Sequence, residues 1–598
     1  MFDFTKEQIK ESLNRNPKDP AVKLTETRAE EIRNNKLLAD AFKSLDRCRE
    51  FYAQRPIYAI PFSMFARYEL DGDRTEFEYD EKGYFMHRGH LKTWALSALF
   101  YGEKKDLSML EDTMWAICDE YTWALPAHMN GNQGIYVNYQ PDRYTIDLFA
   151  AETGQALAEI IRLLGDKLNP LVVKRAKEEI KKRITDRFLY GNISDFWWAH
   201  GTNNWAAVCA GSVGMAAICE YDDNDKLAEM VMKVLESMRT FMSGFSSDGA
   251  CLEGTGYWSY GFGYFSCFAD MLYRRTGGEI DLFNDEKVHL VAMFPLKTFF
   301  YGSRTVSFSD SGSYGGLGLG LITMLSSHYP DMVIPSTAKL SEGVETTGCH
   351  RFALNLRSFI WSGNEKPASS DELKIYPLPE AQWYIANGND NFGFAAKGGN
   401  NNEPHNHNDI GHFIVYRNGD EFFCDLGSGE YSRQYFGKER YTFAHCGSQG
   451  HSVPIINGKT QVAGKDAYAE CVTVDETGIS MRYEKAYRDD TLRELYRKFS
   501  FDKENAVVNI RDRFVFDSKP ESVTERFVTR VKPEVTDGEV ILKTEKGKVA
   551  LKFEKDSFVT SVTPNEVGDH MGVPFTYYNI DLCVKNPEKS MEFEFTVS

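Results

Sequence analysis

The feature that most limits the fold of this chain is a change in hydrophobic period near its middle. Up to about residue 340, apolar residues recur at steps of three and four, as at Val173, Ala176, Ile180 and Ile184, with Lys and Glu between them. Such spacing places one apolar stripe along a helix. From about residue 350, apolar residues alternate or form short runs, separated by turn dipeptides such as Asn418-Gly419. A helical half followed by a half of antiparallel strands is therefore predicted.

Helices are predicted over residues 90–100, 107–121, 145–164, 171–188, 205–221 and 226–242. Strands are predicted over residues 352–361, 413–416, 421–424, 506–510, 526–531 and 593–597. Consecutive helices with short connections favour stacked hairpins, and a ring of hairpins, an (α/α) toroid, is a natural way to close them. No fixed-period repeat is evident, which weakens the alternative of a solenoid. We expect an α+β chain of two domains, helical over 1–345 and antiparallel sheet over 346–598, with a polar surface loop at 363–372.

Charge and composition exclude some classes of partner. The formal net charge of -18 argues against general binding of nucleic acid or of an anionic membrane, since both favour basic surfaces. No stretch of about 20 apolar residues is present, and the first residues lack the pattern of a secretory signal. The 11 cysteines form no CxxC pair, and Cys118, Cys209, Cys219 and Cys267 lie in apolar runs typical of buried thiols. These features favour a cytoplasmic protein, and a homo-oligomer is left open.

The densest group of chemically active side chains lies at residues 403–412, EPHNHNDIGH. Its five metal-binding or acid–base groups are Glu403, His405, His407, Asp409 and His412. In an extended segment alternate residues share a face, so that the first two histidines and the first Asp would point the same way. Such a concentration of histidines is difficult to explain by packing and indicates a functional site.

Two further residues follow this group. Asp425 ends an apolar strand and His451 begins another. Together with His407 they offer two imidazole nitrogens and one carboxylate oxygen, with an open fourth position, which suits Zn²⁺ or a similar divalent ion. From spacing alone, three separately hydrogen-bonded residues are an equally good interpretation.

The helical half contributes the motifs NNW, which begins at Asn203, and EGTGYWSYG, which begins at Glu253. Taken singly, Asn203 or Asn204 is explained as a helix N-cap. Tyr257 and Tyr260 are in the same way explained as aromatic residues at the edge of a core.

The order of the motifs changes this interpretation. NNW, then DG…EGxxYWxYG, then HNHND, then an Asp and a late His resembles the heparinase II/III family of polysaccharide lyases, most strongly between residues 195 and 458. The resemblance implies an (α/α) toroid followed by an antiparallel β-sandwich, with the active site in the cleft between them. Some family members have His where this chain has Trp205.

The resemblance also implies roles for individual residues. Asn204 matches the Asn at the substrate carboxylate, with Asn203 as its competitor. Tyr257 matches the catalytic Tyr, with Tyr260 in the alternative register. His405 matches the catalytic His.

For the sheet half, the resemblance implies that His407, Asp425 and His451 hold a metal. Zinc is the expected ion, in a structural role behind the loop that bears the catalytic His. No organic cofactor is expected. Further catalytic or substrate-binding candidates are His200, Tyr441, Arg88 and Glu253, together with Arg351 and Arg440.

The chemistry expected from the resemblance is β-elimination. The proton next to the uronate carboxylate leaves, and the glycosidic oxygen one carbon further is expelled, giving an unsaturated uronate end. A donor such as Asn204 would stabilise the enolate-like state by about 3–4 kcal/mol. His405, with an ordinary pKa of about 6.5, suits the base, and Tyr257, with one of about 10, suits the proton donor. If the proton and the leaving group lie on the same face of the sugar, Tyr257 could perform both steps.

The expected substrate is a uronate polysaccharide or oligosaccharide, with glycosaminoglycans of the heparan sulfate, hyaluronan or chondroitin type first and alginate or another uronate as the alternative. Three other functions are left open. A toroid-fold hydrolase would need paired carboxylates, for which Glu253, Asp248 and Asp409 are available. A glycan-binding protein would keep the fold without the chemistry, and a third class of enzyme would act through a metal-bound water.

Overall fold

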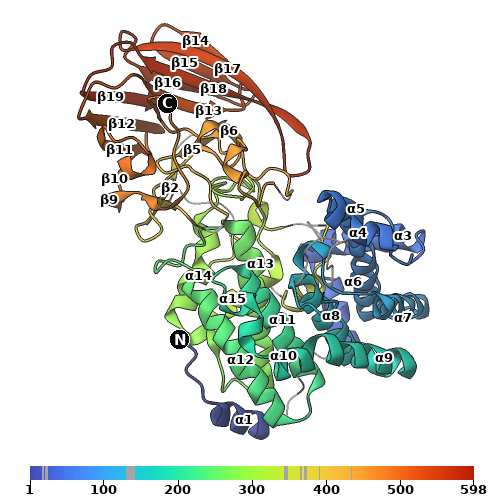
Figure 1. Cartoon of the computed structure of the whole chain (residues 1–598). Helices are drawn as coiled ribbons and strands as arrows, with labels where there is room; N and C mark the ends of the chain where they lie inside the picture. Colours follow the sequence, from blue (N-terminus) through green and yellow to red (C-terminus); the bar gives the residue numbers. More distant parts are fainter. Residues whose placement is uncertain are drawn as a thin grey trace.

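The computed structural model describes residues 1–598 except 17–18, 20–23, 130–141, 342–347, 364–365, 369–373, 389–390, 404 and 433. Helices occupy the first part of the chain and strands the last, and the two parts lie at opposite ends of the molecule in Figure 1. The predicted fold class is confirmed. No helix among the described residues is long and apolar enough to cross a membrane.

The helical half is built from hairpins of one buried and one more peripheral helix. The buried helices are α6 (Tyr84–Phe100), α8 (Leu148–Leu164), α11 (Asn204–Glu220) and α13 (Thr255–Arg275). Each packs on the helix that follows it: α7 (Lys104–Asp119), α9 (Pro170–Ile180), α12 (Asn224–Ser243) and α14 (Glu286–Lys297). The buried helices also pack side by side in the order α6, α8, α11, α13. This order is the one expected of stacked hairpins in a toroid.

The remaining helices of this half are shorter or lie at its edges. They are α1 (Lys6–Arg15), α2 (Glu26–Arg33), α3 (Ala39–Ala53), α4 (Phe62–Asp71), α5 (Thr75–Tyr79), α10 (Asp186–Tyr190) and α15 (Leu319–His328). A π-helical turn at Lys181–Thr185 joins α9 to α10, so the helix predicted over 171–188 is interrupted by one wider turn.

Glycines bring α11 and α13 into close contact. A Cβ on Gly214 of α11 would lie 2.6 Å from the ring of Phe268, and one on Gly261 of α13 would lie 3.1 Å from the Cα of Asn204. Larger side chains at these two positions would push the helices apart. The absence of a side chain therefore fixes the first turn of α11 against the first turns of α13.

One predicted strand is a helix. Residues 352–361 were expected to be extended, but Phe352–Ile360 forms α16, which packs on α15, α13, α8 and α6. Its apolar residues fit both the two-residue period of a strand and the period of about four residues of a helix. Burial against the neighbouring helices favours the helix. The side chain of Arg357 is 4% exposed and pairs with Glu159 of α8 at 2.6 Å. This helix lies beyond the boundary expected at 345/346, which remains a proposal.

The described residues of the sheet half form three main antiparallel sheets. The first is β1 (Ile375–Leu378), β2 (Trp383–Gly388), β3 (Phe392–Lys397), β5 (Phe413–Arg417) and β6 (Asp420–Phe423), in that order. The second has the order β14 (Pro533–Thr536), β15 (Glu539–Lys543), β16 (Lys548–Phe553), β19 (Ser590–Val597), β12 (Val507–Phe516), β11 (Leu492–Asp502), β10 (Gly478–Arg482), β9 (Glu470–Asp475). The third is β17 (Phe558–Gly568), β18 (Pro574–Val584), β13 (Val523–Thr529) and β7 (Ile455–Ile456), and β4 (Asn400–Asn401) pairs with β8 (Gly464–Tyr468).

The five-stranded sheet is buried on both faces. Successive side chains of a strand point to opposite faces. One set joins the core shared with the helical half: Trp383, Ile385, Ala395, Ile414 and Tyr416. The other set joins the core of the sandwich: Tyr384, Ala386, Phe394, Phe413 and Val415. The sheet is therefore the layer that joins the two halves.

The turn dipeptide Asn418-Gly419 lies where the sequence predicted a turn between strands. Asn418 and Gly419 join β5 to β6 with φ values of 51° and 82°, which is the pair of left-handed residues that a tight two-residue hairpin requires. The polar segment 363–372 falls largely outside the described residues. No disulfide joins the described cysteines, and of the four predicted to be buried, three are buried and Cys219 is half-buried.

Candidate active site and cation site

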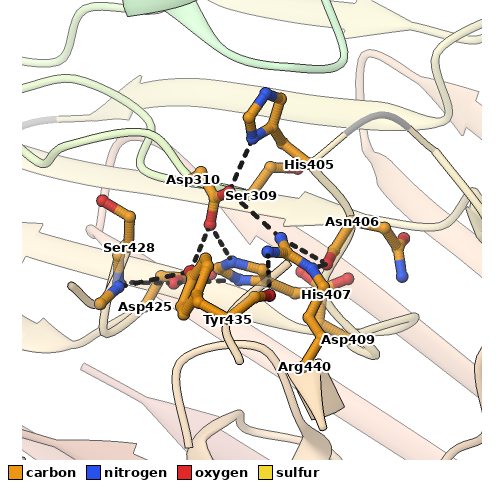
Figure 2. A network of polar contacts seen from close by, with 12 residues as sticks. Ser309, Asp310, His405, Asn406, His407, Asp409, Asp425, Ser428, Tyr435 and Arg440 are labelled. Atoms are coloured by element: carbon orange, nitrogen blue, oxygen red, sulfur yellow. Dashed lines mark hydrogen bonds and ion pairs between the residues drawn. The ribbon is translucent and has the colours of Figure 1, made fainter. Parts of the chain in front are cut away.

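Asp310 lies at the centre of the candidate site, on the loop that follows α14. Its Oδ2 accepts hydrogen bonds from Nδ1 of His405 at 2.7 Å and from Arg440 at 3.1 Å. Its Oδ1 accepts from the hydroxyl of Tyr435 at 2.6 Å and from Nε2 of His407 at 3.1 Å. Figure 2 shows this carboxylate between the two imidazole rings. One buried carboxylate from the helical half thus links two histidines of the sheet half.

The ionisation of Asp310 fixes where the protons of both rings lie. Burial alone would raise the pKa of Asp310, but the hydrogen bonds from His405 and His407 and the charge of Arg440 outweigh it and hold that pKa well below its ordinary value. An ionised carboxylate can only accept hydrogen bonds. In the neutral rings, Nδ1 of His405 and Nε2 of His407 therefore carry the protons, and the opposite nitrogens keep their lone pairs.

His405 presents its free nitrogen at the surface of the site. Its side chain is 20% exposed, and its Nε2 lies 3.7 Å from a carboxyl oxygen of Glu253. The backbone of His405 has φ of 55°, in the left-handed region that side chains other than glycine adopt rarely. Residues 405–412 form no strand, so the expectation of an extended segment with alternate residues on one face is wrong for His405. His405 is partly exposed, whereas the residues that follow it, 406–412, are buried.

Tyr257 stands in the first turn of α13 and stacks on His405. The two ring centroids are 4.2 Å apart with an interplanar angle of 27°. The hydroxyl of Tyr257 lies 2.8 Å from the hydroxyl of Tyr431, which comes from the loop after β6. Burial, with the negative charge of Asp310, raises the pKa of Tyr257 above its ordinary value. The phenol is therefore protonated near neutral pH and suits proton donation.

Asn204 and Glu253 complete this side of the site. Asn203 is the N-cap of α11, and its side chain accepts the backbone N–H of Trp205 at 3.2 Å, so capping accounts for it. Asn204 is the first residue of the helix and is buried. Burial raises the pKa of Glu253, and the nearby His405 and the backbone amide of Asn204 only partly oppose that rise. Glu253 thus lies between the amide of Asn204 and the imidazole of His405.

The second part of the site is a group of fully buried ligand atoms. Nδ1 of His451 donates to the carbonyl of Gly447 at 2.8 Å, so its Nε2 carries a lone pair. This atom lies 3.2 Å from Nδ1 of His407, the other nitrogen left with a lone pair. Oxygens of Asp425 lie 3.4 Å from the first nitrogen and 3.7 Å from the second. Two lone pairs and a carboxylate at these distances fit a divalent cation between them.

His412 lies beside this group but its proton is placed differently. Its Nδ1 accepts the backbone N–H of Ser452 at 2.9 Å, so Nε2 carries the hydrogen and points toward Asp425 at 3.7 Å. Burial lowers the pKa of His412 to about 3, which keeps the ring neutral. A protonated nitrogen cannot bind a metal, and at 3.7 Å it makes no hydrogen bond to Asp425, so His412 in this tautomer is not a ligand.

Other predicted residues lie elsewhere. Arg88 is buried and pairs with Glu120 inside the helical half. The hydroxyl of Tyr260 on α13 donates to Glu152 of α8. His200 is exposed at the end of a 3₁₀ turn.

Arg351, Arg440 and Tyr441 also have defined surroundings. The guanidinium of Arg351 lies 3.9 Å from the ring of Tyr260. Arg440 is held by Asp310 and by the carbonyl of Asn406. Tyr441 lines a pocket of about 400 Å³ in the sheet half.

Sequence reasoning missed Asp310, Tyr431 and Tyr435. A single Asp in a Ser- and Gly-rich loop, FSDSGSYGG, carries no spacing that marks it. The two tyrosines stand four residues apart in EYSRQYF, and aromatic residues at such a spacing are more often part of a core. The packing of the two halves brings Asp310 to the histidines, and the fold of the loop after β6 brings the two tyrosines there.

Comparisons with known proteins agree with this fold. Residues 374–587 match the family model of the heparinase II/III-like C-terminal domain. A comparison with curated proteins finds no match. The fold is similar to a mutant heparan sulfate lyase from Pedobacter heparinus, with a TM-score of 0.57 and 13% identity over 96% of this chain and 92% of that one.

Two more solved structures have the same fold. A heparinase III has a TM-score of 0.56 and 13% identity, and the match covers 96% of this chain and 92% of that one. The chondroitin AC lyase of Streptomyces coelicolor A3, in complex with chondroitin sulphate, has a TM-score of 0.53 and 11% identity over 99% and 82% of the two chains.

Proposed function

We propose, from the premise that the chain carries a heparinase II/III-like C-terminal domain, that it is a lyase of uronic-acid-containing polysaccharides or oligosaccharides. The resemblance inferred from HNHND and the late Asp and His is confirmed for residues 374–587. The names of the similar structures, heparan sulfate and chondroitin lyases, support a glycosaminoglycan as the first substrate to test. Alginate and other uronates are the alternative.

The observation that carries the proposal is the stacking of Tyr257 on His405. A proton donor from the helical half and a base from the sheet half have their ring centroids 4.2 Å apart. β-Elimination needs a base at one carbon of the sugar and an acid at the oxygen bound to the next, so two groups at short range are what the reaction requires. In a hydrolase, two carboxyl groups at a defined separation would occupy these positions.

His405 is the base in this proposal. Donation of its Nδ1 hydrogen to Asp310 leaves the lone pair of Nε2 free to take the proton next to the uronate carboxylate. The imidazolium that forms is stabilised by the same carboxylate. Asp310 is thus a positioning residue, which sets the tautomer and orientation of the base without touching the sugar.

Tyr257 is the acid. Its raised pKa keeps the proton on the phenol until the glycosidic oxygen leaves. Tyr431, whose hydroxyl lies 2.8 Å away, can donate a hydrogen bond to the phenolate that remains. Asn204, at the start of α11, is proposed to hold the substrate carboxylate and so to stabilise the enolate-like state by about 3–4 kcal/mol.

The cation is proposed to have a structural role. His407, Asp425 and His451 would hold a divalent ion such as Zn²⁺, and the ion would supply charge that fixes the loop from His405 to His412. Asp310 contacts both His405 and His407. A fixed His407 therefore also fixes the carboxylate that orients the base.

The carboxylates offered for a hydrolase are not arranged as a catalytic pair. Asp409 is fully buried and bonded to Lys397 at 2.7 Å. Asp248 accepts the backbone N–H groups of Glu380 and Ala381, at 3.0 and 3.2 Å. Of the three residues considered, only Glu253 stands beside the candidate base.

The test is ultraviolet absorbance over time with a panel of uronate polymers and their oligosaccharides. Elimination creates a conjugated unsaturated uronate that absorbs where the substrate does not. We expect a rise with at least one substrate, reduced by roughly a hundredfold or more in Tyr257→Phe and in His405→Ala. Tyr260→Phe is the matched control, since its hydroxyl contacts Glu152 and not His405, and it should keep most of the activity.

Each other result has a defined meaning. New reducing ends without a rise in absorbance indicate hydrolysis and move the assignment to Glu253. A rise lost in Tyr260→Phe but kept in Tyr257→Phe shows that the register of the tyrosine is wrong. Binding of a uronate polymer without any product identifies a glycan-binding protein.

A further inference from the structure

We propose that Asp409 is the fourth ligand of the cation site and closes it into a tetrahedral centre for Zn²⁺. The resemblance implies three ligands, His407, Asp425 and His451, with the fourth position open. The inference rests on the cation site of the proposed function but not on the lyase reaction, because every measurement below is made without substrate.

The distances between the ligand atoms fit a small tetrahedral ion. With metal–ligand bonds of about 2.0–2.1 Å, two corners of a tetrahedron lie about 3.3–3.4 Å apart. The nitrogens of His407 and His451 are 3.2 Å apart, which is the spacing of two corners of such a tetrahedron. Oδ2 of Asp425 lies 3.4 Å from the nitrogen of His451, and Oδ1 of the same carboxylate lies 3.7 Å from the nitrogen of His407. The carboxylate of Asp425 is therefore within reach of the third corner.

Asp409 supplies the fourth corner. One carboxylate oxygen of Asp409 lies within 4.8 Å of ligand atoms of all three other residues. Its Oδ1 is held by Lys397 at 2.7 Å, while its Oδ2 is buried and has no hydrogen-bond partner in the described part of the chain. Oδ2 of Asp425 is likewise buried and has no hydrogen-bond partner among the described residues. Buried carboxylate oxygens without partners are costly, and a shared cation would satisfy both.

Lys397 has a positioning role in this arrangement. Lys397 and Asp409 form an ion pair, and both side chains are at most 2% exposed. Because the ammonium engages one oxygen of the carboxylate, the other is directed to the cluster, as groups around a metal commonly orient its ligands. The two carboxylates together neutralise a divalent ion bound by two neutral imidazoles.

The ligand set also selects the ion. Two imidazole nitrogens with two carboxylates favour Zn²⁺ over Mg²⁺ and Ca²⁺, which prefer oxygen ligands in larger number. Four protein ligands leave no place for a reactive water, and closed sites of this kind are structural. The alternative of an enzyme that acts through a metal-bound water is thus disfavoured by the fourth ligand.

The experiment measures Zn²⁺ affinity by competition with a chelator, metal content after dialysis, and the unfolding temperature of the full chain. Asp409→Asn alone would leave Lys397 buried without its partner, so the informative variants are Lys397→Met and Lys397→Met/Asp409→Asn. We expect the single variant to keep Zn²⁺ within about tenfold of the wild-type affinity and the double variant to lose roughly a hundredfold or more. His412→Asn, which retains an acceptor for Ser452, is the matched control and should bind as the wild type does.

A visible spectrum of the Co²⁺-substituted protein reports the coordination number. We expect the intense bands of four-coordinate Co²⁺ in the wild type and in Lys397→Met. Equal Zn²⁺ affinity in Lys397→Met and in the double variant would overturn the proposal, because Asp409 would then be only the partner of Lys397. Weak bands typical of six-coordinate Co²⁺, a large loss in His412→Asn, or a wild-type chain that retains no Zn²⁺ would overturn it as well.

Discussion

Replacement of Asp310 by Asn should weaken the base and the cation site together. The carboxylate accepts two hydrogen bonds on each oxygen, whereas an amide has one accepting and one donating end. The charged Arg440 favours the amide oxygen on its own side, which His405 shares. The amide NH₂ then faces Tyr435 and His407.

The consequences for the two histidines differ. Tyr435 can rotate its hydroxyl to accept, but His407 has to present a lone pair at Nε2 and carry its hydrogen on Nδ1. That nitrogen faces His451 at 3.2 Å, so the hydrogen enters the cation site. Zn²⁺ affinity should fall by about 10–100-fold, as it does when the partners of metal ligands are removed.

The effect on turnover follows from the bond to His405. Exchange of a charge-assisted hydrogen bond for a neutral one costs about 1–2 kcal/mol, which corresponds to a decrease of about 5–30-fold in kcat. The assays are kcat on the substrate that the absorbance panel identifies and Zn²⁺ affinity by chelator competition. Tyr435→Phe, which removes one donor and keeps the carboxylate, should change both by only a few-fold. An Asp310→Asn chain with unchanged affinity for Zn²⁺ would refute the reasoning about His407.

Three more outcomes are expected. Arg357→Met should lower the free energy of unfolding by about 3–5 kcal/mol because it leaves the buried Glu159 carboxylate without its charged partner, with only Gln155 still donating to it. Arg357→Met/Glu159→Leu should recover much of the loss in denaturant unfolding. Burial raises the pKa of Glu152 from 4.5 to about 7. Protonated Glu152 therefore contributes fully to the free energy of unfolding below pH 4.5. This contribution, at most about 3 kcal/mol, is lost as the pH rises through about 7. Glu152→Gln should abolish this dependence of stability on pH. Complete metal removal should lower the unfolding temperature and activity together, and a fully active, equally stable stripped chain would exclude the structural role.

The sequence predicted the order of the halves because the hydrophobic period is a local property. Long segments such as 145–164 and 226–242 have one period only, and α8 and α12 lie there. Residues 352–361 are short and fit two periods, so their packing on α6 and α13, and not their pattern, makes them helical. Local turn chemistry was equally informative at Asn418-Gly419.

The candidate site was predictable where its residues are close in sequence. His405, His407 and Asp409 could be identified from the sequence because they stand together in HNHND. Asp310 does not, because it meets the histidines only through contacts 95 and 97 residues away in the chain. The backbone of His405 was also beyond prediction, since a positive φ at a residue other than glycine has no signature in the neighbouring residues.

The position of Asp310 has a thermodynamic consequence. All four proposed ligands come from the sheet half, but the carboxylate that holds His407 in its metal-binding tautomer comes from the helical half. Cation binding and docking of the two halves are therefore linked, and each must strengthen the other by the same factor. For every tenfold by which docking raises the affinity for the cation, the bound cation stabilises the interface between the halves by about 1.4 kcal/mol. A chain whose two halves are not docked should bind the cation weakly, so an occupied cation site indicates that the halves are docked.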